Sequence, residues 1–457
     1  MPFVIAVLGF LLPGEAAAHG FGMRYDLPLP LDYFIVGGAA AVFLSFVVAA
    51  LFLRPHRGPA SYRTLTLPSV PYVGTILRVI GVVAFVVTIF AGFFGVPSPY
   101  KNISVVMVWV IGWVGVAFAS VLLGNIWAYL NPWSTLFAWA ERMGKISLDL
   151  RYPPWLGAWP AVASLFVFAW LEINWSGSGV PLNVAIALTA FSILTWTGMM
   201  LFGRAIWAQN GGMFVMIFAL FARFAILEIR EGTVRLRPPV VGLLAPGPAS
   251  FSEIVFVILI LATVTYDGFT ETEPFQSAAL ALFSQLQGLG SIAVPIVSTI
   301  GLASFPLLFV AAYFAVAALV RWTGGTRVPL GIVAGTFVYS LVPIAIAYHL
   351  AHYLSLLVFE GQNVIALVSD PFGFGWDLFG TVGRRVDLTV MNAQFLWFFS
   401  VGVIVIGHIA AVYLAHAEAM RLFADRRTAL LSQIPMLILM LAYTMTSLWI
   451  IAQPIVV

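Results

Sequence analysis

The sequence predicts an all-α polytopic transmembrane helix bundle with about ten transmembrane helices plus one interfacial or re-entrant helix. Three observations predict this class. The chain is 62% hydrophobic and 9% charged, whereas soluble domains are roughly 45–50% apolar and about 25% charged. Its mean hydropathy is +1.03. Apolar runs of about 20 residues, the length that crosses a bilayer, recur from end to end and leave no room for a large soluble domain.

The apolar runs are separated by connectors rich in proline, glycine and asparagine, residues that end helices and form turns. We place the helices near residues 33–53, 72–97, 104–128, 155–173, 182–202, 250–270, 290–319, 331–358, 391–416 and 433–453. The segment 211–227 is apolar but short, and basic residues flank it on both sides. It is therefore predicted to be an interfacial or re-entrant helix and not a further crossing.

Lysine and arginine predict how the chain is threaded, because they concentrate in cytoplasmic connectors. One set of connectors holds sixteen of them: Arg54, Arg57, Arg63, Arg142, Lys145, Arg151, Arg204, Arg223, Arg230, Arg235, Arg237, Arg321, Arg327, Arg421, Arg426 and Arg427. The other set holds four: Arg24, Lys101, Arg384 and Arg385. The first set is predicted to be cytoplasmic. Both termini and the long aromatic loop 360–390 are then extracytoplasmic.

The charge balance and the absence of cysteine exclude several function classes. A formal net charge of +3 is explained by membrane topology, so no nucleic acid partner is expected. Without cysteine the protein has no disulfides, thiolate ligands or iron–sulfur clusters. A metal site would need histidine, carboxylate or carbonyl ligands.

The N-terminal residues resemble an export signal. Its short apolar run ends in Ala16-Ala17-Ala18, an A-x-A pattern suited to signal peptidase. We therefore predict a signal-peptide-like segment at 1–18, followed by a single transmembrane domain at 19–457. After cleavage, His19 would become the N-terminus and could chelate a metal through its amine and imidazole. The alternative is an ordinary extracytoplasmic tail.

Ionisable residues inside the predicted spans are the candidate functional residues, since a central charge costs about 2.5–3.5 kcal/mol. They are Asp267, His349, His352, His408, His416, Glu172 and Arg78. At a rise of about 1.5 Å per residue, His352 and His349 lie roughly 10 and 15 Å below the outer end of their helix. Asp267 lies close to the outer end of another helix. These three residues are expected in the same outer half of the membrane.

Two imidazoles and a carboxylate suit a divalent metal such as zinc, copper or iron. His349, His352 and Asp267 are therefore predicted as metal ligands, with Glu271 or Glu360 as the catalytic base. Glu273 also lies near in sequence. The alternatives are a hydrogen-bonded histidine pair that stabilises the bundle, or a proton relay.

The remaining candidates are expected to have structural roles. His408 is about 25 Å from the outer end of its helix, too deep to join the others, and is expected to make an interhelical hydrogen bond. His416 is expected at the cytoplasmic interface. Glu172 is expected at an outer helix end within reach of water, and Arg78 is expected to extend to the cytoplasmic surface.

Several stretches resemble a family of bacterial multipass membrane proteins, some of whose members are named fenitrothion hydrolase. They are "AHGFGMRYDLPLPL" (18–31), "YDGFTETEPF" (266–275), "YSLVPIAIAYHLAHYLSLLVFEGQ" (339–362), "GHIAAVYLAH" (407–416) and "SQIPMLILMLAYTMTSLWIIAQPI" (432–455). The resemblance implies a protein of the bacterial inner membrane and hydrolysis of an organophosphate triester, a reaction suited to a metal-bound hydroxide. It implies no particular catalytic residues.

Three functions are consistent with these observations. The first is a membrane-embedded, metal-dependent hydrolase with its site in the outer half. The second is a proton- or ion-coupled transporter or channel, because Asp267 and the four intramembrane histidines lie at successive depths. The third is a non-catalytic subunit of a larger membrane complex, docked through the loop 360–390.

Overall fold

The computed structural model describes residues 25–53, 64–67, 72–230, 233–244, 247–423 and 425–453. The signal-peptide-like segment 1–18 and the candidate ligand His19 lie outside the described residues.

Within these ranges, nine helical runs are long and apolar enough to cross a membrane. They are α2 (Leu31–Phe52), α3 (Val73–Phe94), α4 to α5 (Ile103–Leu123), α9 (Pro181–Phe202), α12 (Phe251–Thr270), α13 to α14 (Glu273–Thr323), α15 to α17 (Leu330–Leu367), α18 (Ala393–Leu422), and α19 to α20 (Arg426–Ala452). A shorter apolar run, α8 (Trp159–Ala169) with η2 (Trp170–Asn174), corresponds to the one remaining predicted crossing, 155–173. The predicted all-α polytopic bundle is confirmed.

Several of these runs are composites of shorter elements. Their parts are α4 (Ile103–Val105), the π-helix η1 (Val106–Gly115), α5 (Val116–Leu123), α13 (Glu273–Leu286), η4 (Gln287–Ile292), α14 (Ala293–Thr323), α15 (Leu330–Phe337), η5 (Val338–Leu341), α16 (Val342–Phe359), η6 (Glu360–Gln362), α17 (Asn363–Leu367), α19 (Arg426–Ser432) and α20 (Ile434–Ala452). The short helices α6 (Trp127–Leu130) and α7 (Pro132–Glu141) connect α5 to α8. The predicted spans correspond to α14, to α15 with α16, and to α20 within these runs, which also include α13, α17 and α19. α5 ends at Leu123, before the predicted residue 128, and α18 continues to Leu422, beyond the predicted residue 416.

The predicted re-entrant segment is a bent pair of helices. α10 (Arg204–Asn210) and α11 (Met213–Ala222) meet at an angle of 70°. The chain enters this pair from the end of α9 and leaves it for the start of α12, next to the start of α8, where the Ser252 hydroxyl accepts from the Ala158 backbone N–H. Since α8 and α12 begin at the same end of the bundle, the pair enters and leaves on one side, as the sequence predicts.

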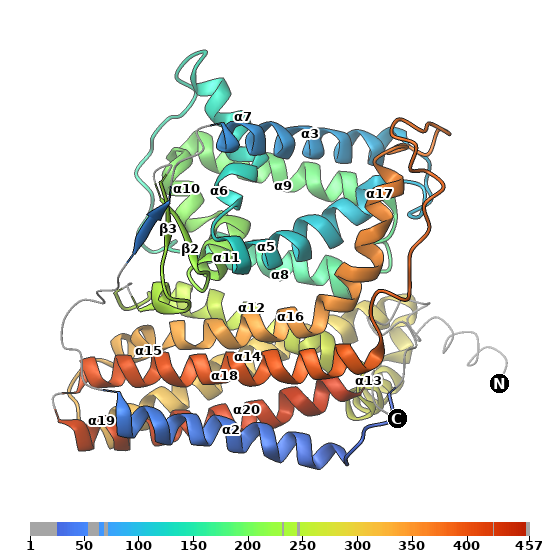
Figure 1. Ribbon diagram of the computed structural model, residues 1–457. Helices are drawn as coiled ribbons and strands as arrows, with labels where there is room; N and C mark the ends of the chain where they lie inside the picture. Colours follow the sequence, from blue (N-terminus) through green and yellow to red (C-terminus); the bar gives the residue numbers. More distant parts are fainter. Residues whose placement is uncertain are drawn as a thin grey trace.

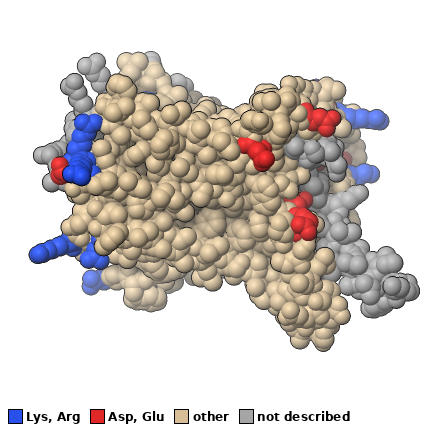
Figure 2. Space-filling view, turned by 90° about the horizontal axis from the view of Figure 1, so that it is seen from below, with Lys and Arg blue, Asp and Glu red and all other residues tan. Residues whose placement is uncertain are grey.

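The long helices run roughly side by side in two layers, with α3, α9, α5 and α8 above α12, α14, α16, α18, α20 and α2 in Figure 1. α8 packs on α12, and α12 and α18 both pack on α16, so the layers meet at α12 and α16. We call the end with α15 and α19 the basic end and the end with α13 and α17 the loop end. Most of the Lys and Arg side chains visible in Figure 2 lie at the basic end. That this end faces the cytoplasm stays a prediction.

α12 and α16 are the central helices, and both are largely buried. α12 begins with a capping box, in which the Ser250 hydroxyl accepts from the Glu253 backbone N–H and the Glu253 carboxylate accepts from that of Ser250. Near its other end, Gly268 allows a close approach to α16, because a Cβ there would stand 2.8 Å from the Tyr348 hydroxyl. The residues that this contact brings together form the candidate site.

A small sheet of connector residues at the basic end was not anticipated from the sequence. β1 (Leu65–Leu67), β3 (Thr233–Leu236) and β2 (Leu227–Arg230) pair antiparallel in that order. Strands of three or four residues are too short to show a period of two. The sheet is followed by Arg237, whose buried guanidinium donates to the carbonyl oxygens of Ala222 (2.8 Å) and Ala225 (3.1 Å). Arg237 thus holds the end of α11.

Replacing Arg237 with alanine is expected to lower the free energy of unfolding by roughly 2 kcal/mol or more, because it leaves buried carbonyl groups at the end of α11 without donors. The measurement is the thermal midpoint in detergent. Arg235→Ala, two residues earlier on β3, is the matched control and should shift the midpoint much less. Equal shifts would mean that Arg237 does not anchor α11.

The loop 360–390 begins with η6 and α17 and has no helix or strand between residues 368 and 392. Its backbone docks on the connection between α3 and α4: the Phe372 carbonyl accepts from the Val96 N–H (2.9 Å) and the Pro371 carbonyl from the Ile103 N–H (3.1 Å). The loop therefore lies over the layer that contains α3. Its role as a docking surface stays a prediction.

Candidate functional site

The centre of the candidate site is the carboxylate of Asp267, in the last turn of α12. Its Oδ2 is 2.8 Å from Nε2 of His352 and accepts a hydrogen bond from the Tyr353 hydroxyl at 3.0 Å. The side chains of His352 and Asp267 are only 8% and 12% exposed. The structure thus brings Asp267 and His352 together, as the depth argument predicts, and adds Tyr353.

A second carboxyl group belongs to the same cluster. Glu172 is partly buried in η2 and lies within electrostatic range of Asp267, close to Tyr353 and Trp113. Glu172 was expected at an outer helix end, and it is indeed in the last turn of its helix. α8, which η2 continues, packs on α12. No pattern in the sequence groups these two carboxyl groups.

Two π-helical segments border the cluster. η1 carries Trp113, which is buried, and η2 carries Glu172. A π-helix adds a residue to the turn and so re-aims the side chains that follow, and such segments occur frequently at functional sites. η1 packs on α16, where Trp113 contacts His349, and η2 packs on α14.

His349 lies in a different environment from His352. Its ring centroid is 4.8 Å from that of Tyr353, 5.1 Å from Trp113 and 5.8 Å from Phe221 in α11. It is fully buried, and among the described residues neither of its ring nitrogens has a hydrogen-bond partner. The Tyr353 ring contacts both histidines, with centroids 4.8 Å from each. The two imidazoles thus share Tyr353, but only His352 contacts Asp267, while His349 contacts Trp113 and Phe221.

This arrangement does not assemble the predicted ligand set. In the part of the chain that the structure describes, no three or more His, Asp or Glu side chains are grouped so that they could hold a metal ion. Asp267 and His352 are in contact, but His349 faces aromatic rings. The metal site with His349, His352 and Asp267 stays a prediction that this geometry does not support.

Of the acids proposed as a catalytic base, Glu271 is the one tied to the cluster. It follows the last residue of α12, and partial desolvation together with the charge of Asp267 raises its pKa, while His352 opposes the shift. Glu360 instead accepts from Asn363 (2.8 Å), and Glu273 accepts from Ser277 (3.0 Å), each within its own turn.

His408 departs from its prediction. Its Nδ1 lies 2.8 Å from the Ile404 carbonyl oxygen, so the hydrogen bond is within α18 and not between helices. The reason is the preceding Gly407, which brings α18 against α16: a Cβ there would be 2.4 Å from the Ala347 Cβ. The ring turns back along its own helix, 5.8 Å from the Tyr443 ring.

His416 and Arg78 lie toward the basic end. His416 is buried where α19 and α20 pack on α18, and its Nδ1 is 3.0 Å from Oε1 of Gln433. Its place at the cytoplasmic interface stays a prediction. Arg78 is exposed in the second turn of α3, with its guanidinium 5.5 Å from the centre of the Tyr129 ring. This position agrees with a side chain that extends to the membrane surface.

Hydroxyl groups that sequence reasoning missed surround the same region. The Tyr348 ring stacks on His352 at 6.3 Å, and the hydroxyls of Thr265 and Tyr443 are hydrogen-bonded. Hydropathy counts tyrosine among apolar residues, so these groups were not scored as polar. The signal was nevertheless present, since Tyr348 and Tyr353 flank the two histidines in "YHLAHY".

Comparison of the chain with protein-family models, with curated proteins and with solved structures gives no match. What the chain is shown to be is a multipass helical membrane protein in which a largely buried carboxylate contacts an imidazole and a phenol near one end of the bundle.

Proposed function

We propose that this protein binds and releases a proton at the Asp267–His352 pair, and that this step couples proton movement to transport across the membrane. The observation that carries the proposal is the 2.8 Å contact between the two side chains, inside an apolar bundle and beside a second carboxyl group, Glu172. Intramembrane acids and histidines of this kind mark proton relays in pumps and transporters.

The chemistry of the cluster suits reversible proton binding. An isolated charge is costly in hydrocarbon, whereas an imidazolium beside a carboxylate compensates it. Glu172, within electrostatic range of Asp267, adds a second group that can bind a proton, and two negative charges there would repel each other. A rearrangement at the contact of α8, α12 and α16 would change the distances between these groups and so how readily a proton binds or leaves.

Polar groups at successive depths support a route for the proton. Tyr348 stacks on His352 next to Asp267, and Tyr443 and Thr265 form the next hydroxyl pair. The ring of His408 lies beside Tyr443. Hydroxyl and imidazole groups can each accept one proton and donate another.

The re-entrant pair supports transport over a purely structural role. Short helices that enter and leave a membrane on one side are tolerated where they are buried in protein or line a water-filled path. α11 is mostly buried, and its Phe221 contacts His349, in the turn before His352.

The test is proton flux into liposomes that contain the purified protein and an entrapped pH-sensitive dye, driven by a potassium diffusion potential. Wild-type protein is expected to admit protons faster than empty liposomes, and His352→Gln is expected to admit them more slowly than wild type. Flux at the level of empty liposomes would contradict the proposal that the protein moves protons across the membrane. A pH-independent infrared spectrum of the carboxyl groups would contradict proton binding itself.

The resemblance to proteins named fenitrothion hydrolase sustains a second candidate, a metal-dependent hydrolase. It requires His349 to leave its aromatic surroundings and join His352 and Asp267 on one ion. Near-stoichiometric zinc, copper or iron in the purified protein, lost in His349→Ala/His352→Ala, would favour this function over proton coupling. The third candidate, a non-catalytic subunit, predicts co-purification of other membrane proteins that is lost when the loop 360–390 is altered.

A further inference from the structure

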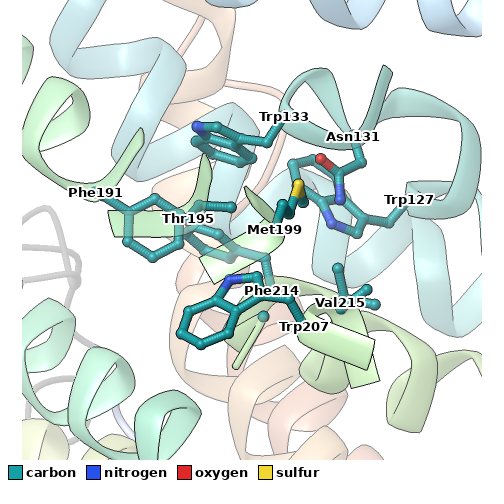
Figure 3. Close-up of a pocket in the computed structure, with 11 residues that line it drawn as sticks. Trp127, Asn131, Trp133, Phe191, Thr195, Met199, Trp207, Phe214 and Val215 are labelled. Carbon is teal, nitrogen blue, oxygen red and sulfur yellow. The ribbon is translucent and has the colours of Figure 1, made fainter. Parts of the chain in front are cut away.

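A small pocket lies where the re-entrant pair bends, away from the Asp267 cluster. Its volume is about 10 Å³, room for about one water molecule. It is lined mainly by aromatic rings from α6, α7, α9, α10 and α11. They include Trp127, Trp133, Phe191, Trp207 and Phe214, and Asn131 and Thr195 add polar groups. Figure 3 shows these rings surrounding one space.

Two hydrogen-bond donors in this wall have no acceptor. The indole Nε1 atoms of Trp127 and Trp207 are buried and make no hydrogen bond within the described residues. Trp133, in the same wall, differs because its Nε1 donates to the Ser192 hydroxyl at 2.8 Å. In Figure 3 the Trp133 nitrogen lies on the side of its ring away from the other two indoles. A buried donor without an acceptor costs about 1–3 kcal/mol, so two in one pocket call for an explanation.

The Trp207 ring is fixed in place. A Cβ at Gly198 would stand 2.2 Å from this ring, and a Cβ at Gly211 would stand 2.7 Å from it. The ring is therefore wedged between α9 and the bend of the re-entrant pair. The donor cannot turn away without moving one of these backbones.

The chemistry of the wall defines what fits. Both unsatisfied groups are N–H donors, so the ligand must supply an acceptor. No lining residue is charged, so an anion would be desolvated without a compensating cation. The volume admits one group of about the size of a water molecule, such as a hydroxyl group.

We propose that this pocket binds a neutral oxygen acceptor of water size, either a water molecule or the hydroxyl group of a small alcohol, through the indole N–H groups of Trp127 and Trp207. The bound oxygen joins α6 to α10 and holds the bend of the re-entrant pair. The proposal is independent of the proton-coupled function, because the pocket shares no residue with the Asp267 cluster.

The test follows the indole N–H resonances of ¹⁵N-tryptophan protein in detergent, assigned with Trp127→Phe and Trp207→Phe. Methanol is the neutral acceptor probe and chloride the anion probe. Trp133 is the control for an indole in the same wall that already has an acceptor. Trp397, whose buried Nε1 also has no partner among the described residues, is the control for an indole outside the pocket.

Hydrogen-bonded shifts for both Trp127 and Trp207 without any addition would identify water as the occupant and support the proposal. Free-indole shifts that move to hydrogen-bonded positions with methanol, while Trp133 and Trp397 stay unchanged, would support an alcohol hydroxyl. Free-indole shifts that methanol leaves unchanged would overturn the site. A response to chloride at fixed ionic strength would overturn the neutral ligand. If one variant fails to fold, the other still assigns its own resonance.

Discussion

Asp267→Asn is expected to reduce the proton flux of the reconstituted protein by about tenfold or more. The amide has the shape of the carboxyl group but cannot exchange a proton, so the pair loses the carboxylate that would compensate an imidazolium at His352 whenever a proton is bound there. Tenfold corresponds to about 1.4 kcal/mol, well below the cost of an uncompensated charge in hydrocarbon. The flux assay in dye-loaded liposomes measures the effect.

Asp377→Asn is the matched control for Asp267→Asn. Asp377 lies in the loop 360–390, where its carboxylate accepts a hydrogen bond from the Val382 backbone N–H at 3.2 Å. The same chemical change there should leave the flux within about twofold of wild type, because this acid is exposed at the bundle's end. If Asp267→Asn behaved like Asp377→Asn, the flux would not pass through the cluster.

Gly407→Ala is expected to have the largest effect on stability among single-methyl changes at this site. Its Cβ would meet the Ala347 Cβ at 2.4 Å and the Pro343 carbonyl oxygen at 2.8 Å, both parts of α16 that cannot move alone. Overpacking of this kind costs about 1–3 kcal/mol. We expect a lower thermal midpoint in detergent and, because α16 carries both histidines, a changed flux.

Gly402→Ala provides the matched control on the same helix. A Cβ at Gly402 would meet nothing within 4 Å, so alanine should leave the midpoint unchanged or raise it slightly through its higher helix propensity. If Gly402→Ala lowered the thermal midpoint as much as Gly407→Ala, the loss of stability would come from α18 itself and not from its contact with α16.

Much of the fold follows from the sequence because the bilayer restricts the possible structures. Long apolar runs must be helical to satisfy their backbone groups, so the crossings could be located, and the basic flanks of 211–227 identified the re-entrant pair. The π-helical turns of η1 and η2 could not be predicted, since they depend on packing and not on hydropathy. The small sheet was missed because its strands are too short for a pattern.

The candidate site was predicted in part. Depth along a helix placed Asp267 level with His352, and the structure brings them into contact. Depth says less about direction: residues three apart on a helix differ by about 60° around its axis. That difference directs His352 to α12 and His349 to Trp113 and Phe221. Glu172 joins the cluster through the packing of α8 on α12, a contact between distant segments that no local pattern contains.

The most direct test of the account is a pH titration of the purified protein by infrared difference spectroscopy, which detects protonated carboxyl groups without knowledge of any substrate. We expect a carboxyl band that changes with pH in the wild type and in Asp377→Asn but is lost or shifted in Asp267→Asn. Identical pH-dependent spectra for all three proteins would contradict the account, because Asp267 would then not take part in proton binding.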